Sequence, residues 1–179
     1  MWTSSPVRQA LILAFCGLSL ACAAQSLPKH KYFSKAPPGT AKYVEQHAID
    51  IGDQPGHQLR VAKLFTKYGE QAPEFDGVKV SEVTSALTSD YVDGSGHFVV
   101  YALLTMANGD RIYERGDAIT RSAPNEASSR KSTFAQVWTI TGGTGNFNAL
   151  RGTLRTAGGT DFKTGTSDVI TEGEYWFDR

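Results

Sequence analysis

The sequence has only two cysteines, Cys16 and Cys22, and both lie within its first 24 residues. The chain that follows therefore has no disulfide, no thiolate nucleophile and no cysteine metal site. An excess of charge is also missing, because without Arg8 there are 17 basic residues against 18 acidic ones. This balance gives no indication of a nucleic-acid partner or of an anionic membrane surface.

Long helical patterns and metal-binding spacings are absent as well. After residue 24 no segment of ten or more residues has the apolar period of an amphipathic helix. The four histidines are scattered along the chain and none stands at the spacing of a metal site: His30, His47, His57 and His97. We therefore expect no metal and no cofactor.

The first 24 residues have the order of a secretory signal peptide. Arg8 precedes the apolar run ALILAFCGLSLACAA, which ends in small residues and is followed by the polar QSLPKHK. The run is too short and too rich in small residues to predict a membrane span. We predict cleavage after Ala24 and a secreted or periplasmic protein. The alternative is a lipoprotein acylated at Cys22, although Ser19 stands where that signal needs an aliphatic residue.

The remaining chain of about 155 residues has the length of one domain. Residues 25–57 predict an N-terminal arm, loose over 25–45, and a possible first strand. Residues 58–179 alternate short apolar segments with turns, and Asn108–Gly109 between 97–107 and 110–120 is a strong hairpin signal. Seven or eight such strands predict an all-β antiparallel barrel or sandwich.

Residues 97–107 are apolar at both odd and even positions. A strand that is wet on one side would show polar residues on that side. We therefore expect the N-terminal arm or another subunit to cover the outer face of this strand.

The glycine-rich segment TITGGTGNFNALRG, residues 139–152, raises the question of nucleotide binding. A dinucleotide fingerprint needs a third glycine where Asn148 stands, and a P-loop needs Gly-Lys-Ser/Thr, which is missing. No helical pattern follows the segment. We predict a strand–turn–strand corner in which Phe147 packs into the barrel end, with structural turn residues Gly142, Gly143, Gly145 and Gly152.

The same segment, TGGTGNFNALRG, resembles the GGTGxF…A-x-G segment of dirigent proteins and its counterpart in the allene oxide cyclase barrel superfamily. The order and residue pattern of two further segments also resemble secreted bacterial members of that superfamily: DYVDGSGHFVVYALLTMANGD and GEYWF. The resemblance covers about residues 58–178. It implies a calycin-like, eight-stranded antiparallel β-barrel with an apolar cavity, often trimeric. Relatives include cyclases, isomerases and dirigents that steer radical coupling, and no catalytic residue is carried over from them.

Candidate site residues come from the alternation along the expected strands. Phe134, Gln136, Trp138 and Ile140 share one face of 132–141, and we predict an aromatic ligand-binding pocket of Tyr101, Tyr113, Phe134, Trp138 and Trp176. The candidate catalytic acids or bases are Glu114 and Glu172, whose pKa would rise on burial. The alternative is that these aromatic residues are core and the charges form exposed cross-strand pairs.

Three functions follow from these observations. The first is an exported small β-barrel that binds a small apolar molecule in its cavity, with no nucleic-acid partner and no membrane span. The second is a cofactor-free cyclase or isomerase that shapes a reactive substrate and stabilises charge with one carboxylate or tyrosine. The third is a dirigent-like scaffold, which would need an external oxidant. By resemblance, a homo-oligomer, specifically a trimer, is also expected.

Overall fold

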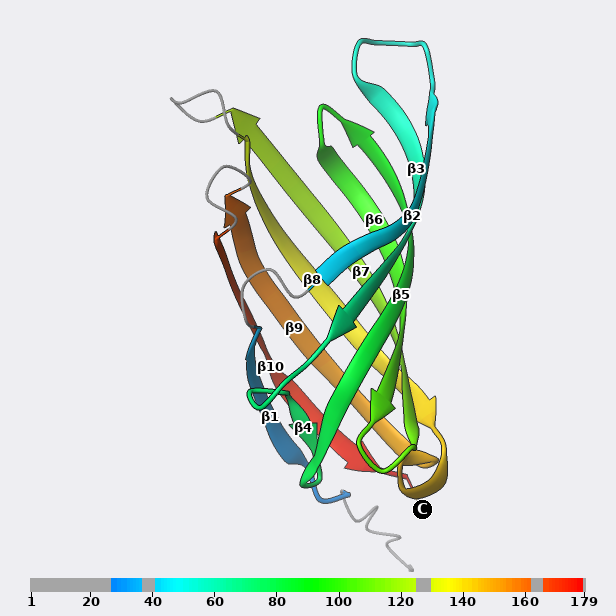
Figure 1. The fold of residues 1–179 in the computed structure, drawn as a ribbon, viewed down its shortest axis with the longest axis vertical. Coiled ribbons are helices and arrows are strands. Elements are labelled where there is room, and N and C mark those ends of the chain that lie inside the picture. The colour runs from blue at the N-terminus through cyan, green and yellow to red at the C-terminus, as the bar shows by residue number, and fades with distance from the viewer. Residues whose placement is uncertain (1–26, 37–40, 125–129, 162–165, 179) are drawn as a thin grey trace, which may run out of the picture.

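The computed structural model describes residues 27–36, 41–124, 130–161 and 166–178. In these ranges it contains strands and one short 3-10 helix, η1 (Figure 1). The elements are β1 (His30–Ala36), β2 (Ala41–Asp50), β3 (His57–Lys67), β4 (Glu74–Phe75), β5 (Val78–Val92), β6 (Ser95–Met106), β7 (Arg111–Pro124), β8 (Arg130–Gly143), η1 (Gly145–Phe147), β9 (Leu150–Asp161) and β10 (Thr166–Phe177). The predicted signal peptide lies outside the described residues.

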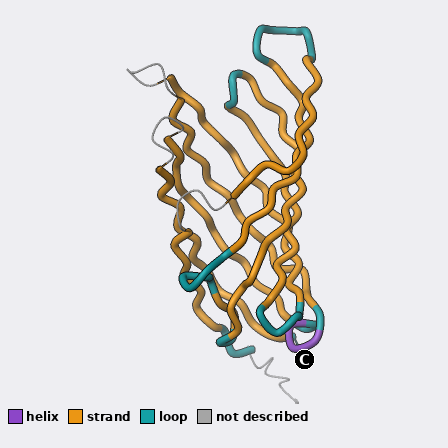
Figure 2. The backbone as a smooth tube through the Cα atoms, in the orientation of Figure 1, coloured by secondary structure: helices purple, strands orange, loops and turns teal. Residues whose placement is uncertain are grey.

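The strands form one antiparallel sheet in the order β1-β10-β9-β8-β7-β6-β5-β3-β2, and β4 pairs with β5. From β5 to β10 each strand pairs with the next one along the chain, which is the meander that the turn signals predict. The sheet curls around its inner face, and almost the whole described backbone is strand (Figure 2). The all-β antiparallel class expected from the sequence is therefore confirmed.

Two details differ from the expected eight-stranded closed barrel. The sheet has ten strands, and β1 and β2 are the two ends of the hydrogen-bonded order, so the described strands do not close the sheet. Within the region 25–57, predicted as an N-terminal arm with a possible first strand, residues 30–36 pair with β10 and residues 41–50 pair with β3. An edge strand needs backbone partners on one side only and can be polar on its open surface, which explains why its apolar signal is weak.

Alternation along β6 and β7 decides which side chains face inward. Val100, Ala102 and Leu104 are buried on the inner face of β6, whereas Tyr101 between them is 59% exposed on the outer face. Neither the described part of the N-terminal region nor any other described element covers Tyr101. The described part of the chain therefore leaves Tyr101 uncovered, whereas Val99 and Leu103 on the same face are half-buried.

The hydrophobic core fills one end of the curled sheet, the lower end in both views, where β4 (Figure 1) and η1 (purple in Figure 2) lie. Phe75 of β4 is fully buried and stacks on Tyr32 with ring centroids 4.6 Å apart. It also meets the edge of Tyr175 at 5.4 Å. Phe147 of η1 is buried in the same cluster, so two short elements close this end of the sheet.

The glycine-rich corner joins β8 to β9 and receives a carboxylate from its own chain. Gly145 has φ +54°, and a Cβ there would collide with the carboxylate of Asp110. The backbone N–H of Asn146 donates to Asp110 Oδ2 at 3.1 Å, and the N–H of Arg111 donates to Thr144 Oγ1 at 2.9 Å. The corner thus ties the β8–β9 connection to the start of β7, and the site that resembled a phosphate cradle is occupied by Asp110.

Replacement of Phe75 tests the closed end. We expect Phe75→Ala to lower the free energy of unfolding by about 3–5 kcal/mol, because a fully buried ring leaves a cavity between two aromatic neighbours. Urea denaturation followed by tryptophan fluorescence measures this loss. The matched control is Phe33→Ala, since Phe33 is 70% exposed and should cost no more than about 0.5 kcal/mol. Equal losses in the two variants would contradict this position of the core.

Candidate functional site

Glu114 is the buried carboxylate of the inner face. It lies on β7 between Ala102 of β6 and Ile140 of β8 in the register of the sheet, and it is only 8% exposed. Burial raises the pKa of Glu114 to about 7, because the charged form loses its hydration without gaining a cation. Its Oε1 atom has no hydrogen-bond partner among the described residues.

Two phenols share the surroundings of Glu114. The pKa of Tyr32 and that of Tyr68 are both raised, first by burial and then by the negative charge of Glu114. This coupling places both rings within electrostatic reach of the carboxylate, Tyr32 from β1 and Tyr68 from the residue that follows β3. Neither phenol ionises near neutral pH, so the group that gains or loses a proton there is Glu114.

Gln136 of β8 is another buried polar side chain of the inner face. It is 7% exposed, and its Nε2 atom makes no hydrogen bond within the described residues. The amide lies over Gly116 of β7, since a Cβ on that glycine would collide with Nε2. The same Cβ would lie 2.8 Å from Cε3 of Trp138. The missing side chain of Gly116 therefore makes the room that the amide and the indole ring occupy.

Trp138 is held on the inner face by a short chain of hydroxyl groups. Its Nε1–H donates to Thr156 Oγ1 at 3.0 Å, and Thr156 Oγ1 lies 2.8 Å from Thr171 Oγ1. These contacts span β8, β9 and β10. The indole N–H is therefore satisfied by the protein, and the half-buried ring remains as an apolar surface.

The chemistry of this inner site follows from its members. A carboxyl group with a pKa about 7 is present as acid and as carboxylate in similar amounts near neutral pH, so it can donate or accept a proton. Gln136 adds an N–H donor, and Trp138 adds an aromatic wall. In the described ranges no group of three or more His, Cys, Asp or Glu residues is arranged to hold a metal ion.

The residues that the sequence predicts for the site lie on two different faces of the sheet. Phe134 and Trp138 lie on the inner face together with Glu114. The outer face carries the other nominated side chains: Tyr101, Tyr113, Glu172 and Trp176. Two-residue alternation groups residues by face, but it does not say which face of a strand is the inner one.

Sequence reasoning did not nominate Gly116 or Gln136 as site residues. Gln136 stands on the face of 132–141 that carries Phe134 and Trp138, so its position was visible, but its lack of a partner was not. Gly116 is a glycine within a strand, which is a signal for close approach by another group. That the approaching groups are the amide of Gln136 and the ring of Trp138 follows only from the fold.

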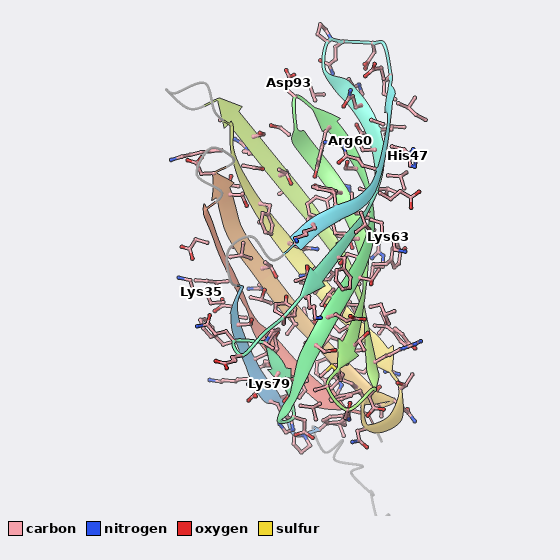
Figure 3. All side chains as sticks on the ribbon, in the orientation of Figure 1. Lys35, His47, Arg60, Lys63, Lys79 and Asp93 are labelled. Carbon is pink, nitrogen blue, oxygen red and sulfur yellow. The ribbon has the colours of Figure 1, made fainter. Side chains whose placement is uncertain are left out.

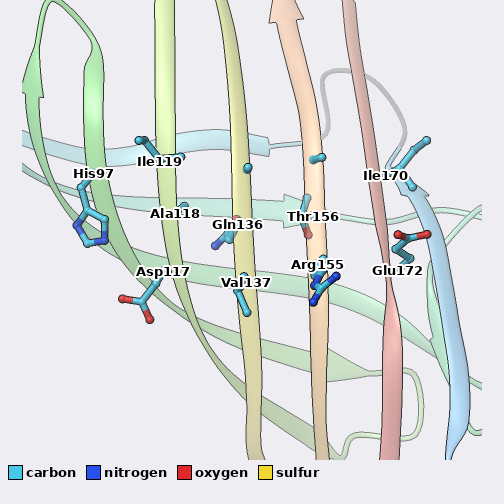
Figure 4. A pocket seen from close by; sticks show the side chains of 12 residues that line it. His97, Asp117, Ala118, Ile119, Gln136, Val137, Arg155, Thr156, Ile170 and Glu172 are labelled. Atoms are coloured by element: carbon cyan, nitrogen blue, oxygen red, sulfur yellow. The ribbon is translucent and has the colours of Figure 1, made fainter.

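A groove of about 800 Å³ lies on the outer face of β6 to β10, where the sequence predicted a cavity inside (Figure 4). Ala135 and Ala157, which pair across β8 and β9, line this groove. Its other lining residues include both charged and apolar side chains. The apolar lining side chains include Ile119, Val137 and Ile170, and the charged ones are Asp117, Arg155 and Glu172. Away from the groove, exposed polar side chains include Lys35, His47 and Lys79 (Figure 3).

Comparisons with known proteins were made with both sequence and structure. No family model and no curated protein matches the sequence. Among solved structures the chain is similar to the pterocarpan synthase dirigent protein PsPTS1, with 15% identity and a TM-score of 0.43 over 86% of this chain and 96% of that chain. At these values the likeness carries no argument about substrate or site residues. No described helix is long and apolar enough to cross a membrane.

The buried carboxyl predicts a pH-dependent stability. Between the unfolded pKa of 4.5 and the folded pKa of about 7, the folded state holds a proton on Glu114 that the unfolded state has released. Stability from this group is therefore complete below pH 4.5 and lost as pH rises to 7, by on the order of 3 kcal/mol. Glu114→Gln lacks this loss, so it should match the wild type at pH 4.5 and exceed its free energy of unfolding at pH 8.

Urea denaturation from pH 4.5 to 8 measures the difference. Glu70→Gln is the matched control, because it removes an exposed carboxylate away from the inner face and the outer groove and should keep the wild-type pH dependence. Parallel curves for the wild type and Glu114→Gln would contradict the raised pKa of Glu114.

Proposed function

We propose that this protein is exported and binds a small, largely apolar molecule against the inner face of its curled sheet. The observation that carries the proposal is the presence, on one face, of half-buried inward aromatic side chains and of the buried Glu114, whose Oε1 atom has no hydrogen-bond partner among the described residues. Ligand sites commonly combine apolar walls with a few polar groups that fix orientation. Residues 1–24 supply the export signal in this proposal, and lipid attachment at Cys22 is its alternative.

Inward side chains beyond the closed end favour this location. Leu87, Phe98, Phe134 and Trp138 belong to β5, β6 and β8, and each is only half-buried although it faces inward. Solvent therefore reaches an apolar surface on the concave side of the sheet. A ligand that covers it gains roughly 25 cal/mol for each Å² of apolar surface removed from water.

A cofactor-free cyclase or isomerase is the second candidate, and the protonation of Glu114 is the observation that favours it. A general acid or base is most effective when its pKa lies near the working pH, and burial raises the pKa of Glu114 to about 7. In this function the carboxyl would exchange a proton with a bound substrate while Trp138 and Phe134 hold the substrate in shape. A dirigent-like scaffold would use the same walls to orient a species oxidised elsewhere.

Self-association through the outer face is part of the proposal. Tyr101, Ile119, Val137 and Ile170 are exposed large apolar side chains on that face, and a groove runs between the last three. The groove carries both acidic and basic side chains, Asp117 and Glu172 with Arg155, so the surface has complementary charges for a second copy of itself. Mixed charge and apolar area are the features expected of an interface between copies.

Native mass spectrometry of protein purified from its own host tests ligand binding. We expect a small molecule retained by the wild type and by Trp176→Leu, because Trp176 is on the outer face and bonds Asp178 through Nε1 at 3.1 Å. Trp138→Leu should lose most of it, since the inner aromatic wall is removed. A retained mass that changes to a second species on incubation favours the enzyme. Absence of any retained molecule, or equal retention in both variants, contradicts the proposed binding site.

Sedimentation velocity tests self-association. We expect the wild type to sediment as an oligomer. Val137→Lys should raise the dissociation constant of the oligomer by at least about tenfold, because it places a charge in the apolar part of the groove. Ile51→Lys is the control, since Ile51 is exposed on the β2–β3 connection away from the groove. A monomeric wild type would refute the interface.

A further inference from the structure

We propose that the inner site recognises a neutral oxygen group, a carbonyl or a hydroxyl, on an apolar skeleton, through Gln136 and Glu114. This inference rests on the proposed binding function and adds the chemical class of the ligand. It assigns the ligand's polar end to two side chains and the ligand's body to the aromatic wall around Trp138.

The first support is the absence of partners for two deeply buried groups. Glu114 and Gln136 are each more than nine-tenths buried, yet Glu114 Oε1 and Gln136 Nε2 make no hydrogen bond within the described residues. Buried polar atoms without partners destabilise a fold, and proteins contain few of them. A protein can retain this destabilisation when a bound ligand supplies the missing hydrogen-bond partner.

The second support is the placement of the two groups. In the register of β7 and β8, Glu114 lies opposite Ile140 and Gly116 lies opposite Trp138, while Gln136 stands one inward position farther along. The Gln136 amide lies over Gly116, so it reaches back toward the level of the carboxylate. The two polar groups therefore lie on the same inward face of neighbouring strands, on either side of the place where the Gln136 amide and the Trp138 ring fill the room left by Gly116.

The third support is the type of hydrogen bond that each group offers. Gln136 Nε2 is a donor, so its partner must be an acceptor. An ammonium group has no acceptor and cannot satisfy it. Burial is the cause of the raised pKa of Glu114, and within the described ranges its charge acts on the phenols of Tyr32 and Tyr68. A carboxylate ligand would lack a counter-charge beside protonated Glu114 and would also be repelled once Glu114 ionises.

A neutral oxygen satisfies both groups. A carbonyl oxygen has two lone pairs, one for the Gln136 N–H and one for the protonated Glu114 carboxyl. A hydroxyl accepts from Gln136 and can also donate to ionised Glu114. The two classes thus differ in pH dependence: the carbonyl loses one donor as Glu114 ionises through its pKa of about 7, whereas the hydroxyl keeps both contacts.

Four probes with one skeleton test the inference: phenylcyclohexane, 4-phenylcyclohexanone, 4-phenylcyclohexanecarboxylate and 4-phenylcyclohexylamine. Binding to the full-length mature protein is measured by quenching of tryptophan fluorescence at pH 6. We expect the ketone to bind at least about tenfold more tightly than the hydrocarbon, and the carboxylate and the amine to bind more weakly than the ketone. At pH 8 the advantage of the ketone should fall by at least about threefold.

Gln136→Leu and Glu114→Leu separate recognition from folding. Each should remove most of the ketone's advantage and leave hydrocarbon affinity within about twofold, because only the polar contact is lost. Their urea midpoints at pH 6 should be unchanged or raised, since an unpaired buried group is replaced by an apolar one. Gln58→Leu is the control, because its Nε2 already donates to Asp50 Oδ1 at 2.7 Å.

The outcomes distinguish this inference from the binding function on which it rests. Equal binding of ketone and hydrocarbon overturns the neutral-oxygen assignment and leaves the proposed binding function in place. Tightest binding of the amine or the carboxylate also overturns the assignment. Failure of all four probes to bind counts against both. A lowered urea midpoint of Gln136→Leu with an undiminished ketone advantage would mean that Gln136 has a structural role.

Discussion

The hydrogen-bond register between β7 and β8 is the constraint on which the inner site depends. Side chains alternate between the two faces of a strand, so a shift of one residue would turn Glu114 outward and bring Arg115 inside. The register places Glu114 beside Ile140 and Gly116 beside Trp138, and it shifts at a bulge between Tyr113 and Glu114. The bulge lies next to the glycine-rich corner of residues 139–152, so this corner adjoins Glu114, the buried carboxyl group with the raised pKa.

The closed end of the sheet supports the burial of that residue. Phe75, Tyr32 and Tyr175 pack together there, and Tyr32 also lies within electrostatic reach of Glu114. One aromatic ring therefore belongs both to the core and to the surroundings of the carboxyl group. Packing of the core excludes water from Glu114, and the exclusion of water raises its pKa. The stability of one end and the protonation of the site are consequences of the same packing.

Much of the fold was predictable from local patterns. Alternating apolar positions, the Asn108–Gly109 turn and the glycine-rich corner indicated an antiparallel meander without helices, and the strands follow that order. For the edge strands the sequence indicated only an arm with one possible strand, because β2 is exposed along its whole length and has little apolar signal. The candidate site was predictable in part: Glu114, Phe134 and Trp138 share the inner face, but Tyr101, Tyr113 and Trp176 lie outside.

The sequence by itself determined the class of the fold, because turn residues and two-residue periodicity act over a few neighbours. It also determined which residues share a face of each strand. Only the tertiary structure decided which face is the inner one, which carboxylate loses its water and which polar atoms remain without partners. These properties depend on residues far apart in the chain, such as Gly116, Gln136 and Tyr32, and local sequence patterns carry no information about such distant contacts.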